Sequence, residues 1–208
     1  MSATPTSPSA LPAIWLASRS PRRRELLDQL GIVYDVLSFE IDETSIPNET
    51  TRDYVLRIAT CKAETGWQQV VQRRLAERPV LAADTSVVAD GEILGKPGTP
   101  ERALAMLRKL SGRSHQVMTA VAIAWRDRID TDLSVSEVVF ADIEDSILQD
   151  YAHGKEPLDK AGAYAIQGQA ARFVRHLSGS YSGVMGLPAF ETVQLLERLS
   201  RQEIFSRR

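Results

Sequence analysis

Short apolar runs alternate with segments of helical periodicity along most of the 208-residue chain. Residues 13–17 (AIWLA) predict a strand, and residues 22–30 that follow carry leucines on one helical face and end at Gly31. The same alternation recurs downstream, which predicts an α/β fold. Further strands are expected over residues 33–37, 79–83, 116–124, 133–142 and 172–177, and further helices over residues 51–74, 99–110, 143–152 and 188–201.

Turn residues indicate how some of these strands connect. Asp90-Gly91 separates two short apolar runs at 87–89 and 92–94, which is a strong hairpin signal. The long strands on either side of the polar turn at residues 126–128 are expected to pair antiparallel. The all-apolar strand over 79–83 is of the buried kind and is expected to stop at Asp84. Together these features predict a mixed, twisted sheet with flanking helices.

Composition limits the class of protein. The chain is 43% hydrophobic and 25% charged with a net charge of -2, which argues against a broadly basic nucleic-acid or membrane-surface binder. A single cysteine, Cys61, excludes an intramolecular disulfide and favours a reducing, cytoplasmic compartment. The longest apolar run, residues 120–125, is too short to cross a bilayer. Residues 1–12 predict a disordered tail, and residues 13–208 a single domain.

The segment after the first strand is a candidate anion site. Four of the six residues from 19 to 24 are arginines, at the start of a helix for which Ser20 is the expected N-cap. Arg22 and Arg23 in the first turn oppose the helix dipole, and a local rule broken in this way suggests function. Their guanidinium groups, the free amides and the hydroxyls of Ser18 and Ser20 could bind phosphate together. The alternative is a solvated basic face.

Carboxylates follow two of the predicted strands. Asp42-Glu43 lies beyond the strand over 33–37, and Asp84-Thr85 ends the strand over 79–83. Ligands of open α/β sheets bind at strand ends, and carboxylates there suit Mg²⁺ or Mn²⁺ with phosphate oxygens completing the coordination. The alternatives are a solvent loop for Asp42-Glu43 and a turn-forming cap for Asp84.

Three lysines and one glutamine stand in unusual surroundings. Lys96 is held between Gly95 and Pro97, Lys62 lies on the helix over 51–74, and Lys160 opens a segment of small residues. The amide of Gln167 in that segment could read a pyrimidine edge as donor and acceptor. Single lysines are otherwise ordinary surface charges, and the segment is otherwise a loop. No P-loop, G-x-G-x-x-G or H-E-x-x-H motif is present.

The ordered set of these motifs resembles the Maf-like nucleoside triphosphate pyrophosphatases over nearly the whole chain after the tail. The resemblance implies a Maf/ITPase-like fold with two closely packed lobes around a cleft, and a homodimer. It also implies hydrolysis of a nucleoside triphosphate to the monophosphate and pyrophosphate with a divalent cation (Mg²⁺, Mn²⁺ or Co²⁺), as housecleaning of nucleotide pools. The motifs are LASRSPRR at 16–23, Asp42-Glu43, Ala83-Asp84-Thr85, Gly95-Lys96-Pro97, Leu110-Ser111-Gly112 with residues 115–119, KAGAYAIQG at 160–168, and Gly186-Leu187-Pro188.

Two of the motifs, at 83–85 and 160–168, look like those of the dTTP/UTP branch. By that resemblance Asp84 is the proton acceptor, and Arg22, Thr85 and Gln167 set base selectivity. From the residues themselves we expect Glu43 and Asp84 to form the catalytic and metal-binding pair. Ser86 and Gly183 depart from the family pattern, where an aliphatic residue and asparagine are usual. The substrate-binding residues implied are Ser18, Ser20, Arg22, Arg23, Lys62, Thr85, Lys96, Lys160 and Gln167.

Other functions are consistent with the same residues. A nucleotide-binding regulator of cell division would use the same arginines and carboxylates without hydrolysis. A pyrophosphatase of the 7-methyl-GTP type would differ around the base. A nucleic-acid module is disfavoured by the acidic total and the lack of an aromatic platform.

Overall fold

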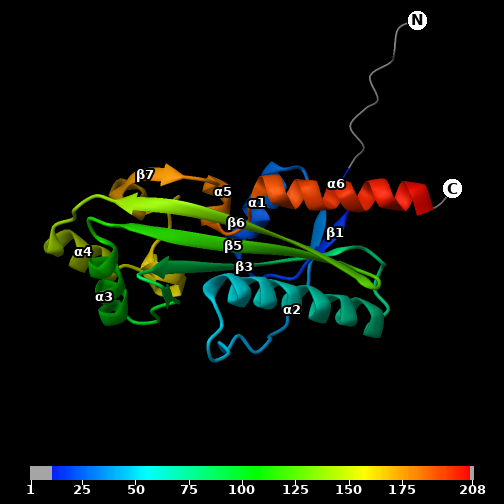
Figure 1. Cartoon of the computed structure of the whole chain (residues 1–208), viewed down its shortest axis with the longest axis horizontal. Coiled ribbons are helices and arrows are strands. Elements are labelled where there is room, and N and C mark those ends of the chain that lie inside the picture. The colour runs from blue at the N-terminus through cyan, green and yellow to red at the C-terminus, as the bar shows by residue number, and fades with distance from the viewer. Residues whose placement is uncertain (1–10, 207–208) are drawn as a thin grey trace, which may run out of the picture.

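The computed structural model describes residues 11–206, with side chains as far as residue 201, so residues 1–10 of the predicted tail lie outside it. The described chain forms one mixed seven-stranded sheet flanked by helices (Figure 1), as predicted. The strand order is β2-β1-β3-β5-β6-β7, with β4 paired to β3. The strands are β1 Ile14–Leu16, β2 Tyr34–Val36, β3 Val80–Ala89, β4 Glu92–Leu94, β5 Ser114–Trp125, β6 Arg128–Phe140 and β7 Val174–Ser178.

Helices cover both faces of this sheet. The long helix α2 packs across β3 and β5 on one face, and α1, α5 and α6 lie on the other (Figure 1). Among the described helices, none combines the length and apolar character needed to cross a membrane. The helices are α1 Pro21–Gln29, α2 Thr51–Gln72, α3 Pro100–Leu110, α4 Asp145–Ala152, α5 Tyr181–Met185 and α6 Ala189–Ser206, with short 3-10 turns η1 Pro157–Asp159, η2 Ala161–Ala163 and η3 Gln169–Phe173.

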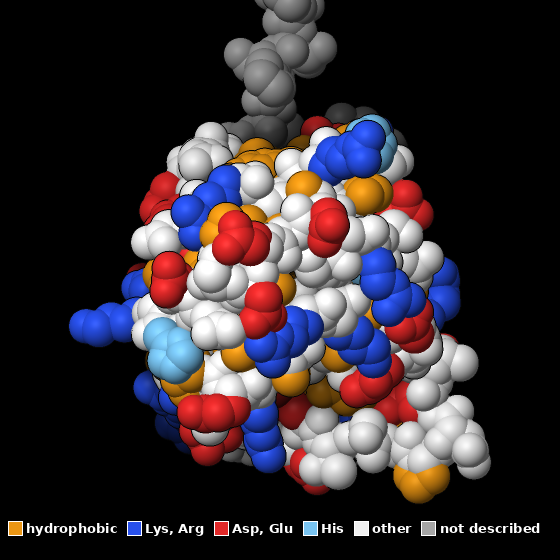
Figure 2. Space-filling view, turned by 90° about the vertical axis from the view of Figure 1, so that its left-hand side faces the viewer, with side chains coloured by type: hydrophobic (Ala, Val, Ile, Leu, Met, Phe, Trp, Pro, Cys, Tyr) orange, Lys and Arg blue, Asp and Glu red, His pale blue; other side chains and the backbone are white. Residues whose placement is uncertain are grey.

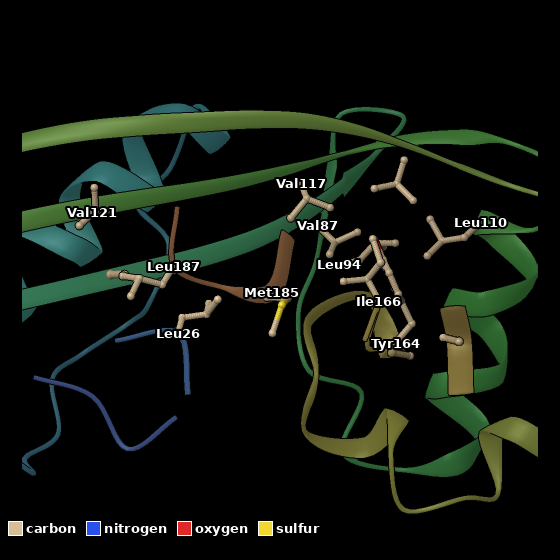
Figure 3. Close-up of a cluster of buried hydrophobic side chains, with 14 of the residues drawn as sticks. Leu26, Val87, Leu94, Leu110, Val117, Val121, Tyr164, Ile166, Met185 and Leu187 are labelled. Carbon is tan, nitrogen blue, oxygen red and sulfur yellow. The ribbon is translucent and has the colours of Figure 1, made fainter. Parts of the chain in front are cut away.

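The central strand β3 contributes to two hydrophobic clusters. Its residues Val80 and Ala82 pack toward α2, whereas Leu81 and Val87 belong to the cluster on the α1, α5 and α6 side. Figure 3 shows part of the second cluster, where Leu26 of α1 and Met185 of α5 lie near the strands. A strand buried on both faces is expected to be apolar on both, which explains why β3 shows no alternation and is apolar at every position except Asp84, Thr85 and Ser86.

The predicted strand connections are confirmed. Asp90 and Gly91 form the tight turn between β3 and β4, with φ values of 53° and 76°. β5 and β6 pair antiparallel from Ser114 opposite Val139 to Trp125 opposite Arg128, and β6 begins five residues earlier than residue 133 because it pairs along the whole of β5.

One expectation about β3 is wrong. The strand does not stop at Asp84 but continues to Ala89, because its pairing with β5 runs unbroken from Val80 to Val88. On its other edge β3 pairs with β1 at residues 80–81 and with β4 at residues 87–89. Residues 82–86 therefore have no strand partner on that edge within the described chain, and the sheet has a gap there.

At one end of the molecule the surface carries charges of both signs. Figure 2 shows Lys and Arg side chains interspersed with Asp and Glu over this end, where α3 and α4 pack together. Arg108 of α3 forms a two-bond ion pair with Asp145 of α4, at 2.6 and 2.7 Å. This face therefore presents no single-sign patch to a charged partner.

A histidine is buried in the core beside the 3-10 turns. His115 is 3% exposed, and its Nε2 lies 2.8 Å from the hydroxyl of Tyr164. Phe140 packs edge-on against both rings. The other ring nitrogen, Nδ1, has no hydrogen-bond partner among the described residues. Burial lowers the pKa of His115 to about 4.

The loop after β4 and the segment that contains η1 and η2 are joined by backbone hydrogen bonds. The Gly162 N–H donates to the Gly95 carbonyl at 3.2 Å, and the Gly98 N–H donates to the Leu158 carbonyl at 3.1 Å. Gly162 and Gly98 have similar left-handed φ values of 67° and 71°. A Cβ at Gly162 would lie 2.8 Å from a methyl carbon of Val87, whereas one at Gly98 would meet nothing within 4 Å.

Replacing each of these glycines with alanine tests the packing of the loops. Both variants bear the left-handed backbone strain of about 1 kcal/mol. Only Gly162→Ala also overpacks against Val87, so we expect it to lose about 1–3 kcal/mol more of the free energy of unfolding. Urea denaturation of the two variants measures the difference, and equal losses would contradict the packing described here.

The buried histidine predicts a pH dependence of stability. Because the native pKa lies below the unfolded value of about 6.5, the unfolded chain takes up a proton first, and stability is lost as the pH falls from about 6.5 toward 4. Between pH 7 and pH 4.5 the free energy of unfolding of the wild type should fall by about 2–3 kcal/mol more than that of His115→Gln, whose side chain does not titrate. Denaturant unfolding at both pH values measures this, and identical losses would rule out His115 as the cause.

Candidate functional site

A cavity of about 790 Å³ opens at the gap beside β3, within the usual size range of small-molecule sites. All the site residues predicted from the sequence line it, although they come from segments far apart in the chain. Their chemical roles stay predictions. These residues are Ser18, Ser20, Arg22, Arg23, Glu43, Lys62, Asp84, Thr85, Lys96, Lys160 and Gln167.

The gap in the sheet explains how two neighbouring residues of β3 reach the cavity. β1 ends at Leu16 and the chain turns away into α1, so the edge of β3 beyond Leu81 is uncovered. Successive side chains of a strand point to opposite faces, which turns Asp84 toward α2 and Thr85 toward α1. The expectation that carboxylates follow strand ends thus holds for Glu43, which lies beyond β2, but not for Asp84, which lies within its strand.

Lys62 joins the two predicted metal-binding carboxylates. Its Nζ lies 2.6 Å from Oε1 of Glu43 and 2.9 Å from Oδ1 of Asp84. The side chains of Lys62 and Asp84 are 16% and 13% exposed, and that of Glu43 is 49% exposed. Desolvation acts to raise the pKa of Glu43, but the hydrogen bond and charge of Lys62, together with the charges of Lys96 and Arg23, outweigh it, so this pKa is lowered.

The loop that carries Glu43 is tied to α2 by two residues that sequence reasoning missed. The Tyr54 hydroxyl donates to the Glu43 backbone carbonyl at 3.0 Å. One turn along the helix, Arg57 donates to the Thr44 carbonyl at 3.1 Å and to both carboxylate oxygens of Glu49 at 2.6 and 2.7 Å. The sequence predicts that both residues lie on the helix α2, but it does not indicate that their side chains bind backbone groups of this loop.

Arg23 links three elements at the opposite side of the cavity. Its Nε donates to the Gly186 carbonyl at 2.7 Å, and its two terminal nitrogens lie 3.1 Å from the Ser18 hydroxyl and 3.4 Å from the Thr85 hydroxyl. Burial lowers the pKa of Arg23, and the charge of Asp84 acts in the opposite direction. The guanidinium is therefore fixed between α1, β3 and the end of α5.

Thr119 supports this arrangement from β5. Its hydroxyl lies 3.0 Å from that of Thr85 and donates to the Gly183 carbonyl at 2.7 Å. Thr119 is 1% exposed. The sequence does carry a signal for Thr119: it is a polar residue between Val117 and Val121 on the buried face of an otherwise apolar strand.

The N-terminus of α1 faces the cavity with its capping position occupied by Ser20. The Ser20 side chain makes no capping hydrogen bond, contrary to expectation, and its N–H instead donates to the Ser18 hydroxyl at 3.2 Å. The first turn contains no acidic residue, so its positive end is not neutralised from within the helix. Burial lowers the pKa of Arg22, against the charges of Asp159 and Glu25.

The far wall is formed by the two joined loops. Lys96 is exposed on the loop after β4, and Gln167 is exposed between η2 and η3. Lys160 pairs with Asp159 beside it. Tyr164 and Ala165 add buried apolar surface to this wall.

Cations outnumber carboxylates around the cavity. Arg19 pairs with Glu40, Lys160 with Asp159, and Lys62 with the two carboxylates described above. The others have no ion-pair partner within the described part of the chain, which leaves positive charge for a polyanionic ligand. These unpaired cations are Arg22, Arg23 and Lys96.

Glu43 and Asp84 are suitable donors for a hard divalent cation. Both contact the same Lys62 nitrogen, so both carboxylates lie on the same side of the cavity. The described residues include no cluster of three or more His, Cys, Asp or Glu that could hold a metal ion by itself. A pair of carboxylates fits a cation such as Mg²⁺, which keeps several waters and takes other oxygens from substrate phosphates.

Comparison with known proteins places the chain in a family. It is 50% identical over 194 residues to the dTTP/UTP pyrophosphatase of Dechloromonas aromatica, which covers 89% of this chain and 96% of that protein. It is 52% identical over 192 residues to the dTTP/UTP pyrophosphatase of Nitrosomonas europaea, covering 88% and 93%.

Among solved structures, the Ham1 protein of Staphylococcus aureus matches 92% of this chain and 99% of its own, with a TM-score of 0.47 and 15% identity. The family described as Maf-like protein matches residues 13–199. With this match and relatives about half identical along most of their length, the chain belongs to the Maf-like protein family.

Proposed function

We propose that this chain hydrolyses dTTP and UTP to the monophosphate and pyrophosphate. The observation that carries the proposal is the cavity in which Arg22, Arg23 and Lys96 have no ion-pair partner among the described residues and face the pair of carboxylates held by Lys62. A triphosphate has the charge to match the cations, and its anhydride bonds are the groups that such a site can hydrolyse. The relatives named dTTP/UTP pyrophosphatase support the choice of pyrimidine nucleotides.

The residues divide into a binding group and a reacting group. Arg22, Arg23 and Lys96, with the N-terminus of α1, bind the phosphates and stabilise the charge that develops on pyrophosphate as it leaves. Asp84 orients a water molecule and accepts its proton as the anhydride between the α- and β-phosphates is cleaved. Glu43 and Asp84 would hold a divalent cation (Mg²⁺, Mn²⁺ or Co²⁺), which when bound supplies positive charge to the phosphate oxygens.

A non-hydrolysing nucleotide-binding regulator is the second candidate, since unpaired cations suffice for binding. Incubation of the purified protein with dTTP and Mn²⁺ separates the two: equal amounts of dTMP and pyrophosphate support the enzyme, and binding without turnover supports the regulator. Release of orthophosphate instead of pyrophosphate would show that the bond to the γ-phosphate is the one cleaved. A panel of dTTP, UTP, CTP and 7-methyl-GTP then fixes the base preference, and a preference for 7-methyl-GTP would contradict the proposed branch.

The homodimer, the cytoplasmic location and the role in nucleotide-pool housecleaning that the resemblance implies stay predictions. A reducing compartment suits a chain with one cysteine. The exposed Phe190 and Val33, at 73% and 67%, are apolar surface that a second subunit could cover.

Asp84→Asn tests the reacting group. We expect turnover to fall about 10²- to 10⁴-fold, because an amide cannot accept the proton of the attacking water. Nucleotide affinity should change little, since the unpaired cations remain. Asp90→Asn is the matched control, because it makes the same change in the exposed turn after the same strand. Normal turnover by Asp84→Asn would remove Asp84 from this role.

Arg22→Ala tests the binding group. We expect the KM for dTTP to rise about tenfold or more, because a charge-assisted contact to phosphate is lost. Arg24→Ala is the control: Arg24 is exposed on the same helix and does not line the cavity. Steady-state kinetics of both variants decide the point, and the same KM change in both would indicate a general charge effect.

A further inference from the structure

Gln167 reaches the cavity from a short segment that has little structure of its own. It lies between η2 and η3, is exposed, and its side-chain amide makes no hydrogen bond among the described residues. The direction in which it points therefore depends on what fixes the backbone on either side. Before it, Tyr164 and Ile166 are buried in the core beside Leu94 and Leu110 (Figure 3).

After Gln167, the backbone is fixed by the carboxylate of Glu156. Its Oε2 accepts from the Gln169 N–H at 3.0 Å, and its Oε1 accepts from the Ala170 N–H at 3.3 Å. These two amides open η3 and would otherwise lack partners. A Cβ at Gly168 would lie 2.3 Å from Oε2, so the carboxylate fills the space that a side chain there would need.

Tyr151 connects this carboxylate to the core. Its hydroxyl donates to Oε1 of Glu156 at 2.7 Å. Its ring packs edge-on against that of Phe173, with 5.2 Å between the ring centroids. Tyr151 is 3% exposed and belongs to α4. Burial, together with the hydrogen bond to Glu156, raises the pKa of Tyr151, so the phenol keeps the proton that it donates.

We propose that Glu156, held by Tyr151, is a positioning residue that presents Gln167 to the base of the bound nucleotide, an inference that rests on the proposed function. Glu156 does not line the cavity and acts through the backbone of residues 168–170. An amide can offer a donor and an acceptor to a pyrimidine edge only when its direction is fixed. Recognition of the base thus depends on a carboxylate that does not contact it.

A double-mutant cycle between Glu156→Gln and Gln167→Ala tests this inference. Glutamine at position 156 offers one acceptor oxygen in place of two, so one of the η3 amides loses its partner. We expect the KM for dTTP to rise about tenfold while kcat stays within about threefold, because the reacting carboxylates are untouched. In the Gln167→Ala background the same substitution should raise KM less than about twofold.

Two further variants sharpen the result. Tyr151→Phe keeps the carboxylate but removes its support, and should shift KM in the same direction by a smaller factor. Asp145→Asn is the matched control, because Asp145 also lies outside the cavity lining and also accepts several hydrogen bonds, but from the side chains of Arg108 and Gln149 rather than from the backbone beside Gln167. Its KM should equal that of the wild type. Thermal unfolding of each variant shows that the fold is retained.

An equal rise in KM in both backgrounds would overturn the inference, because Glu156 would then act through another route, such as its charge near Arg22. Hydrogen exchange gives a readout independent of activity: the amides of residues 169 and 170 should exchange faster in Glu156→Gln. Unchanged exchange would also count against it. If the wild type releases no pyrophosphate, the proposed function fails, and the same cycle measured on the Kd of dTTP still decides the role of Glu156.

Discussion

Lys62 holds two carboxylates from separate parts of the chain on one side of the cavity, and the rest of the candidate site is arranged around this contact. It connects α2 to β3 through Asp84 and to the loop after β2 through Glu43. Removing one partner of a buried pair leaves the other charge uncompensated, which costs about 3–5 kcal/mol. Because both carboxylates pair with Lys62, neither forms an ion pair with Arg22 or Arg23 in the described chain, and these arginines stay available for a ligand.

Parts of this site follow from local sequence signals. The strand, loop and helix around Ser18 and Arg23 are specified by adjacent residues, as is the Asp90-Gly91 turn, so sequence predicts them well. That Ser18 and Gln167 line the same cavity could not be predicted in this way, because no local signal relates two residues so far apart in the chain. Local chemistry singled out the members of the cavity lining one segment at a time, and the ordered family motifs joined them into one site.

Other parts had no signal that a single sequence could supply. Asp84 resembles the end of a strand because a carboxylate usually ends one, but long-range pairing with β5 keeps it inside β3. The contacts of Tyr54 and Glu156 are made to backbone groups, which are the same at every position and leave no pattern in the sequence. Tyr181–Met185, a helix of five residues, was too short for periodicity to indicate.

The apolar faces on both sides of β3 leave its alignment with β5 weakly specified by hydrophobicity alone. Polar contacts mark that alignment instead: Thr85 stands directly opposite Thr119, and Asp84 turns to Lys62 on the other face. A slip of one residue would exchange these two side chains between the faces and bury a carboxylate without its lysine. Uniqueness of the strand pairing and chemistry in the cavity therefore depend on the same residues, so a substitution made to alter one also puts the other at risk.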